Sequence, residues 1–183
     1  MNKRFQTITR VLAFIAVIAI TVLVYSMRDQ TERLAVYGYP GIFLISFLAY
    51  ATVLLPAPGV AVVFAMGAVF HPVGVALAAG SGAALGETTG YLVGFSGQGV
   101  VERADIYEKL TVWMQRNGPL TVFLLAAIPN PFFDMAGLVA GVLKMPYLKF
   151  LLFCWLGQMV KMLFFAYAGA VSLDNLVSRI FGK

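Results

Sequence analysis

Charge is the scarcest property of this sequence. Asp, Glu, Lys and Arg together make up 11% of its 183 residues, whereas 61% are hydrophobic and the mean hydropathy is +0.88. Soluble domains carry about 25% charged residues, so this chain has too few to cover a surface that faces water. The composition excludes an ordinary soluble domain and predicts an integral membrane protein whose surface faces lipid.

Cysteine and histidine are also nearly absent, with one residue of each. Cys154 lies inside an apolar run, where a lone thiol usually packs rather than reacts. His71 stands next to Pro72 at an expected membrane edge, where we interpret it as structural. The sequence has no metal-ligand spacing, no phosphate-binding glycine loop and no nucleophile motif. These absences argue against an enzyme, and we expect no cofactor and no metal.

The net charge of +5 comes from basic residues that stand largely at the ends of apolar segments. No basic patch is interleaved with aromatic residues, so we expect contacts with anionic lipid headgroups and no nucleic-acid binding. The first ten residues are basic and contain no acid, and an apolar run follows over residues 11–25. This pattern predicts an uncleaved transmembrane helix within residues 1–33, a cytoplasmic N-terminus and a multi-pass protein of the inner or plasma membrane.

Two prolines interrupt a long stretch that has no acidic or basic residue. The stretch runs from residue 34 to residue 86, and Pro56 and Pro58 lie in its middle. The apolar limbs on either side, residues 42–55 and 60–70, are shorter than the ~20 residues that a helix needs to cross the hydrocarbon core. We predict a re-entrant helical hairpin over about residues 41–71, with two full spans and a proline kink as the alternative.

The second half of the sequence repeats this arrangement. Pro129 and Pro131 interrupt another apolar stretch, which predicts a second re-entrant hairpin over about residues 119–145. A proline opens the crossing helix that is expected after each hairpin, because a proline in the first helical turn loses no hydrogen bond. The two crossing helices are expected over about residues 73–96, after Pro72, and over about residues 146–170, from Pro146.

A polar interval separates the two halves. Its apolar residues recur at helical spacing, so we predict an amphipathic helix on the membrane surface over about residues 99–116, and a short amphipathic tail covers residues 173–183. One crossing separates the two hairpins, so the second hairpin should enter the membrane from the opposite side. The expected fold is an all-α inverted repeat within one membrane domain, residues 34–172.

Glycines recur at helical spacing in both halves. In lipid, small residues at this spacing let the backbone of another helix approach closely. The contact can be internal or between two copies of the chain, so a homo-oligomer stays open. The glycines predicted to serve helix packing are Gly82, Gly86, Gly90, Gly94, Gly137 and Gly141.

Four polar residues stand at positions expected at membrane depth, namely Glu87, Asn130, Asp134 and Lys161. Burial of charge in lipid is costly, so an ionisable residue there is a functional hypothesis by default. Asp134 falls in the first turn after Pro131, where Asn130 is the expected helix cap. Glu87 and Lys161 match each other in the two halves, so we expect a pair that acts either as a structural lock or as a gate.

The returning limb of each hairpin begins at a proline break. Its N-terminus then points toward the middle of the membrane with partial positive charge and free N–H groups. Two such ends from opposite sides favour an anionic group such as a lipid phosphate. The alternative is that the prolines only shape the hairpins.

The motifs of this chain resemble those of the DedA/VTT superfamily, also called SNARE-associated Golgi proteins. The similarity rests on Gly67-Ala-Val-Phe70, on Gly86-Glu87 and Gly90-Tyr91, and above all on Ile128-Pro-Asn-Pro-Phe-Phe-Asp134-Met-Ala-Gly137. Pro146-Tyr147 and Gly157-Gln-Met-Val-Lys161 bring it nearest to the vacuole-membrane-protein-type branch. The resemblance implies two opposed re-entrant hairpins and movement of lipid between leaflets, with Glu87, Asn130, Asp134 and Lys161 as functional residues.

The chain departs from the common bacterial pattern of this superfamily at two places. Ala126 and Ala127 occupy the region where that pattern has an arginine, and Val60 stands where an acid often follows the first proline motif. Both departures argue against a proton-coupled mechanism.

Lipid translocation between leaflets, by a scramblase-like or flippase-like path for a phospholipid or a polyprenyl phosphate, is the function that this sequence predicts. The expected path runs between the two hairpins. A proton- or ion-coupled transporter of a small solute is the first alternative, and a membrane scaffold that transports nothing is the second. Lipid movement in vesicles, uptake driven by a pH gradient, or neither would distinguish the three.

Overall fold

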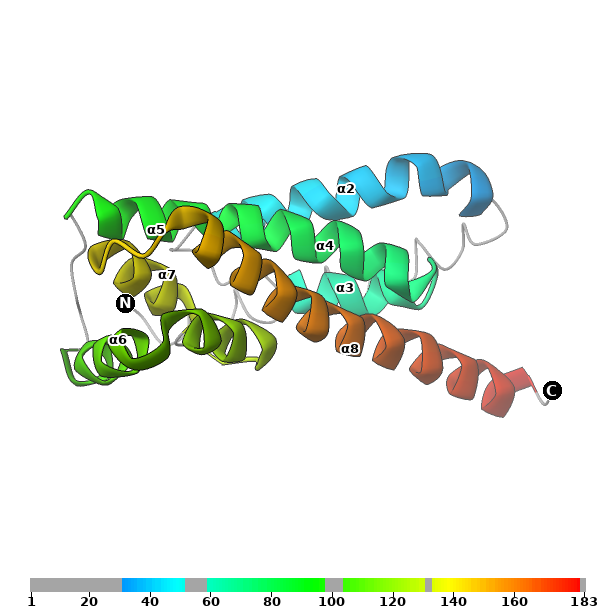
Figure 1. The fold of residues 1–183 in the computed structure, drawn as a ribbon. Coiled ribbons are helices and arrows are strands. Elements are labelled where there is room, and N and C mark those ends of the chain that lie inside the picture. Colours follow the sequence, from blue (N-terminus) through cyan, green and yellow to red (C-terminus); the bar gives the residue numbers. More distant parts are fainter. Residues whose placement is uncertain (1–30, 52–58, 98–103, 131–132, 182–183) are drawn as a thin grey trace, which may run out of the picture.

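A computed structural model describes residues 31–51, 59–97, 104–130 and 133–181 of the chain, without the side chains of 31–37, 104–106, 134 and 173–181. All regular structure in this part is helical, which confirms the all-α class there (Figure 1). The predicted N-terminal transmembrane helix lies outside the described residues, as do Pro56, Pro58 and Pro131. The helices are α2 (Thr31–Ala51), α3 (Gly59–Gly67), α4 (Pro72–Gly86), α5 (Thr88–Phe95), α6 (Ala104–Ala127), α7 (Phe133–Val142) and α8 (Tyr147–Phe181).

The predicted crossing helix after His71 is divided in two at Glu87. Helix α4 begins at Pro72, and the hydrogen bonds from Glu87 N to Ala83 O and from Tyr91 N to Glu87 O carry the chain directly into α5. The Thr89 hydroxyl donates to the carbonyl of Gly86 at 2.9 Å and to that of Ala51 in α2 at 3.0 Å. Such a side-chain bond competes with the helix ladder and bends the helix, which accounts for the interruption beside the acid.

The predicted surface helix and the first limb of the second hairpin form one bent helix, α6. Asn117 has φ −153° and ψ 75°, which is non-helical, and separates the two limbs. The Asn117 side-chain oxygen accepts a hydrogen bond from Leu120 N at 3.4 Å, as an N-cap does, and Pro119 stands in the first turn of the second limb. The sequence Asn-Gly-Pro therefore ends one helix and starts the next without an intervening loop.

A tight turn joins α7 to α8. Met145 N donates to Ala140 O at 3.0 Å and Lys144 N to Gly141 O at 2.9 Å, the two bonds of a Schellman motif, with Lys144 at φ 52°. Helix α8 then continues to Phe181, through the tail that the sequence analysis separated from it. Its segment Tyr147–Ser172 has 26 residues, an 18-residue stretch of it has a mean hydropathy of 1.6, and it is the one helix within the described residues that is long and apolar enough to cross a membrane.

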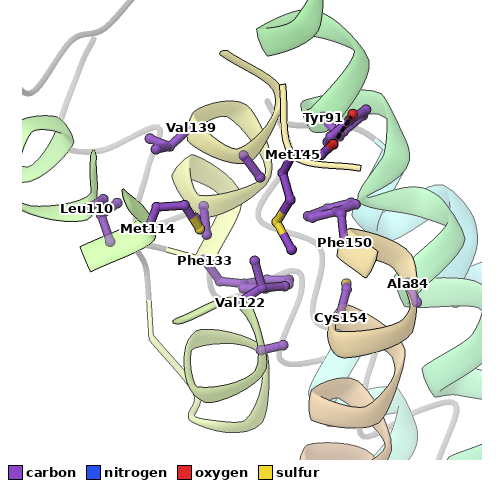
Figure 2. Packing of buried hydrophobic residues seen from close by; sticks show 13 residues of the cluster. Ala84, Tyr91, Leu110, Met114, Val122, Phe133, Val139, Met145, Phe150 and Cys154 are labelled. Atoms are coloured by element: carbon purple, nitrogen blue, oxygen red, sulfur yellow. Dashed lines mark hydrogen bonds between the residues drawn. The ribbon is translucent and has the colours of Figure 1, made fainter. Parts of the chain in front are cut away.

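Two hydrophobic clusters share α4 and α8. The first joins them to α5, α6 and α7 around Phe150, Phe133 and Tyr91, and Figure 2 shows these side chains with Met145 among them. The second joins them to α2 and α3 around Val63, Ile42 and Met162. Figure 1 shows α8 running diagonally across the molecule, so that one helix ties both clusters together.

The outer faces of the helices are apolar rather than polar. Large hydrophobic side chains stand exposed on α2, α3, α4, α5, α6 and α8, and Leu148 and Phe164 of α8 are 77% and 68% exposed. A soluble monomer rarely exposes so much contiguous apolar surface. Lipid is the solvent that suits this surface, so the protein is a membrane protein.

Glycines mark the places where helix backbones meet. A Cβ atom added to Gly82 would collide with Phe43 O of α2, and one added to Gly157 with Phe123 O of α6. Four further collisions follow a reciprocal pattern between helices that are distant in sequence. Between α3 and α8, Gly67 meets Ala166 O and Gly169 meets Phe64 O. Between α5 and α7, Gly141 meets Tyr91 O and Gly94 meets Leu138 O.

Candidate functional site

A few polar side chains are buried inside this apolar protein. Those of Glu87, Gln158 and Lys161 are 3%, 0% and 5% exposed, and they come from the α4–α5 junction and from α8. Isolated polar groups are costly to bury in an apolar interior. These three buried residues and their surroundings are therefore the candidate functional site.

Glu87 occupies the interruption between α4 and α5 and faces α7. A Cβ atom added to Gly137 of α7 would lie 3.5 Å from Glu87 Oε2 and 3.5 Å from Glu87 O. The carboxyl group therefore lies at ordinary contact distance from the α7 backbone at Gly137. Since Gly137 follows Asp134 by one helical turn, the backbone of the residues predicted in the second hairpin borders this acid.

Lys161 lies in the middle of α8 between two aromatic rings. Its Nζ atom is 5.2 Å from the ring centre of Tyr50, near the end of α2, and 5.2 Å from that of Phe133, at the start of α7. Cation–π contacts of this kind stabilise an ammonium group that is withdrawn from water. The amine thus stands where α2, α7 and α8 meet.

Helix α7 connects the acid and the amine in space. On α7, Gly137 borders Glu87, and Phe133, one turn earlier, lies under the Lys161 amine, so the same helix contacts both charged residues. Cys154 is fully buried in the first hydrophobic cluster, and Figure 2 shows it on α8. Two residues that are far apart in the sequence, Glu87 and Lys161, therefore belong to one buried region.

Gln158 is the residue of this region that the sequence analysis missed. Both its Nε2 and its Oε1 are buried, and neither has a hydrogen-bond partner within the part of the chain that the structure describes. It stands one turn after Cys154 and one turn before Lys161 on α8, so the three share a face of that helix. This spacing was visible in the sequence, but a lone glutamine attracts less notice than a charge.

Asn130 serves the end of α6. Its amide nitrogen donates to the carbonyl of Leu125 in the last turn of α6 at 2.8 Å and to that of Ile128, just after the helix, at 2.7 Å. Pro129 is exposed beside it. Asp134 lies in the first turn of α7, and its side chain is outside the described residues, as are Pro56, Pro58 and Pro131.

The predicted packing glycines are all buried, but they do not share one partner. Gly82 and Gly86 meet the backbone of α2, whereas Gly94 and Gly141 meet α7 and α5 respectively. Gly137 makes only ordinary contact, with Glu87 and Tyr91 of the opposite helix. The sixth predicted packing glycine, Gly90, is buried in α5.

The arrangement is suited to binding rather than to covalent chemistry. A carboxyl, an amine and an amide together can hold a polar or charged group by hydrogen bonds and electrostatics in a region of low dielectric constant. Among the described residues, no group of three or more His, Cys, Asp and Glu side chains could hold a metal ion. The site therefore offers recognition of a polar group inside an apolar protein.

Comparison with known proteins assigns the chain. The VTT domain family matches residues 55–171, which span α3 to α8 and include every described residue of the candidate site except Tyr50. Neither a curated protein nor a solved structure matches the chain. The vacuole-membrane-protein-type branch remains an assignment from sequence motifs. The extent of the match shows that the chain belongs to the VTT-domain family, that of the DedA and SNARE-associated Golgi proteins.

Proposed function

We propose that the two halves of the chain form an inverted repeat with two opposed re-entrant hairpins. The reciprocal backbone contacts support this. In the return limbs, Gly141 lies as many residues after Gly67 as Leu138 lies after Phe64. In the crossing helices, Ala166 lies as many residues after Tyr91 as Gly169 lies after Gly94. The return limb of each half thus packs on the crossing helix of the other.

The same correspondence bears on the polar residues. The residue that follows Glu87 by the spacing of the return limbs is Lys161, and the residue that follows it by the spacing of the crossing helices is the next one, Met162. A pseudo-twofold axis between the halves then passes near both charged residues. Secondary transporters place their substrate sites at such an interface between repeats, which favours a transport role for the region around Glu87, Gln158 and Lys161.

The proposed activity is movement of lipid between leaflets, for a phospholipid or a polyprenyl phosphate. The observation that carries it is the burial of an acid, an amine and an amide together within a protein whose outer faces are apolar. A lipid can keep its acyl chains in the surrounding bilayer while its headgroup passes the polar groups. The chain is then a multi-pass protein of the inner or plasma membrane with a cytoplasmic N-terminus.

A leaflet assay in proteoliposomes tests this proposal. Fluorescent lipid is distributed over both leaflets, and an impermeant reductant is added outside. Wild-type protein should expose the inner-leaflet lipid to the reductant, whereas Glu87→Gln and Asp134→Asn should slow its loss at least tenfold. Glu108→Gln, which removes an exposed acid of α6, is the matched control and should leave the rate unchanged. Equal rates for all folded variants would reject the site.

Proton- or ion-coupled transport of a small solute is the second candidate. The burial of the Glu87 carboxyl at the α4–α5 junction favours it, because a carboxyl there can carry a proton across an apolar region. Uptake of a solute in response to a pH gradient, without lipid movement, would support this candidate. Loss of that uptake in Glu87→Gln would assign the proton to Glu87.

A further inference from the structure

The bend of α6 encloses a groove that lies apart from the buried polar site. The first limb contributes Trp113 and Arg116, and the second limb contributes Leu120, Leu124, Leu125 and Ile128. The groove has a volume of about 440 Å³. In Figure 1 the bent helix lies at the side of the molecule away from α2, so the groove is on the flank of the protein rather than at its centre.

Hydrogen bonds hold the bend that shapes this groove. The Thr121 hydroxyl of the second limb donates to the carbonyl of Trp113 at 3.2 Å and to that of Asn117 at 2.9 Å. Leu120 N donates to the Asn117 side chain from the same limb. The two walls are therefore tied together at the bend, and the groove is a feature of the folded helix.

The chemistry of the groove changes from one end to the other. Arg116 places an exposed cation beside the half-exposed ring of Trp113, and beyond the bend the wall is formed by exposed leucine and isoleucine side chains. The axial distance from Arg116 to Ile128 is at most about 18 Å at 1.5 Å per residue. One leaflet of a bilayer has about 15 Å of hydrocarbon, and tryptophan is enriched at its polar boundary.

We propose that this groove binds a membrane lipid with an anionic headgroup. The headgroup lies on Arg116 and one acyl chain lies along Leu120, Leu124 and Ile128. A second cation, Lys149, lines a hollow of about 290 Å³ with Gly118 on another side of the same bend, which adds to the attraction for an anion. The inference needs only that the protein resides in a membrane, so it stands or falls independently of lipid movement.

The two tryptophans of the chain allow a direct test. In the Trp155→Phe variant the remaining fluorescence comes from Trp113, and lipids with brominated acyl chains quench it on contact. Brominated phosphatidylglycerol should quench at a roughly fivefold lower mole fraction than brominated phosphatidylcholine, the preference expected from one basic residue near the surface. Arg116→Gln should remove most of this preference, with Lys149 supplying what remains.

A matched control and salt complete the experiment. Lys109→Gln removes an exposed charge about two turns earlier on the same limb, outside the groove, and should keep most of the preference. Raising the salt concentration should weaken the preference without any change at Arg116. Equal quenching by both lipids would show ordinary contact with acyl chains and overturn the proposal. Absence of quenching by either lipid would show that protein, such as a second copy, covers the groove, and would overturn it equally.

Discussion

The segment after Pro72 is made mostly of small residues, whereas the segment after Pro146 is made mostly of large ones. Helix α4 presents alanines and glycines, so the backbone of α2 comes into contact at Gly82 and Gly86. Helix α8 presents large side chains, with Phe150 and Met162 at the centres of the two hydrophobic clusters. The first segment is interrupted at its acid and the second runs unbroken through its amine.

This difference shows how two charged groups can be buried by different means. Glu87 lies at the α4–α5 junction, beside the α7 backbone at Gly137. Lys161 lies in a regular helix and is flanked by the rings of Tyr50 and Phe133. Backbone geometry accommodates the acid, and aromatic side chains accommodate the amine.

Removing one buried charge at a time should have the largest effect on stability. If Glu87 and Lys161 act as a pair, Glu87→Gln and Lys161→Gln should each lower the free energy of unfolding by about 3–5 kcal/mol, because the remaining charge stays buried. The double variant should lose clearly less than the sum. Reversible unfolding in detergent, followed by circular dichroism, measures this double-mutant cycle. Strictly additive losses would mean that the two charges are accommodated independently.

Two glycines one turn apart on α7 sharpen the comparison at the level of the backbone. Gly141→Ala places a methyl group against Tyr91 O and should cost about 3 kcal/mol, whereas Gly137→Ala makes ordinary contacts and should be nearly neutral. The counterparts Gly67→Ala and Gly169→Ala should cost as much as Gly141→Ala. Thermal unfolding in detergent ranks the four variants. If Gly67→Ala or Gly169→Ala does not lower the stability, the α3–α8 and α5–α7 contacts are not equivalent.

Gln158 distinguishes stability from function within α8. Gln158→Met has similar volume and removes a buried amide that lacks partners among the described residues, so it should raise the free energy of unfolding by about 2 kcal/mol. The same change should reduce lipid movement if the amide contacts the headgroup. Gln115→Met, at an exposed position of α6, should alter neither quantity measurably. A destabilised but active Gln158→Met would contradict both expectations.

The smallest expected effect lies in the turn before α8. Lys144 adopts φ 52°, a conformation that costs a residue with a Cβ atom about 1 kcal/mol relative to glycine. Lys144→Gly should therefore stabilise the protein by roughly that amount. Lys149→Gly, in the first turn of α8, should destabilise it by a similar amount, because glycine is a poor helix former. If thermal unfolding shows that both variants change the stability in the same direction, Lys144 does not adopt this conformation.

Much of the local structure followed from the sequence. The helix start at Pro72 and the non-helical stretch around Pro129 were predicted because proline acts on its own backbone. The interruption at Glu87 was not predicted, since it involves a bond from Thr89 to Ala51 of another helix. The surface helix expected to about residue 116 and the limb expected from about residue 119 do meet at a break, at Asn117, but the sequence did not show that no loop separates them.

The candidate site shows the same division. Glu87 and Lys161 were identified because any charge is conspicuous in a sequence so poor in charge. Gln158 was overlooked, because only its burial without partners makes a neutral amide notable. The groove along α6 was also invisible, since it depends on the angle between two limbs of one helix.

The sequence by itself determined that this protein resides in a membrane, that it is helical and where several helices start and break. Those properties depend on composition and on local backbone chemistry. The tertiary structure decided which polar groups meet. Glu87 and Phe133 come near each other only because α5 and α7 approach at Gly94 and Gly141, where the backbones touch directly, and the Lys161 amine of α8 lies over the Phe133 ring.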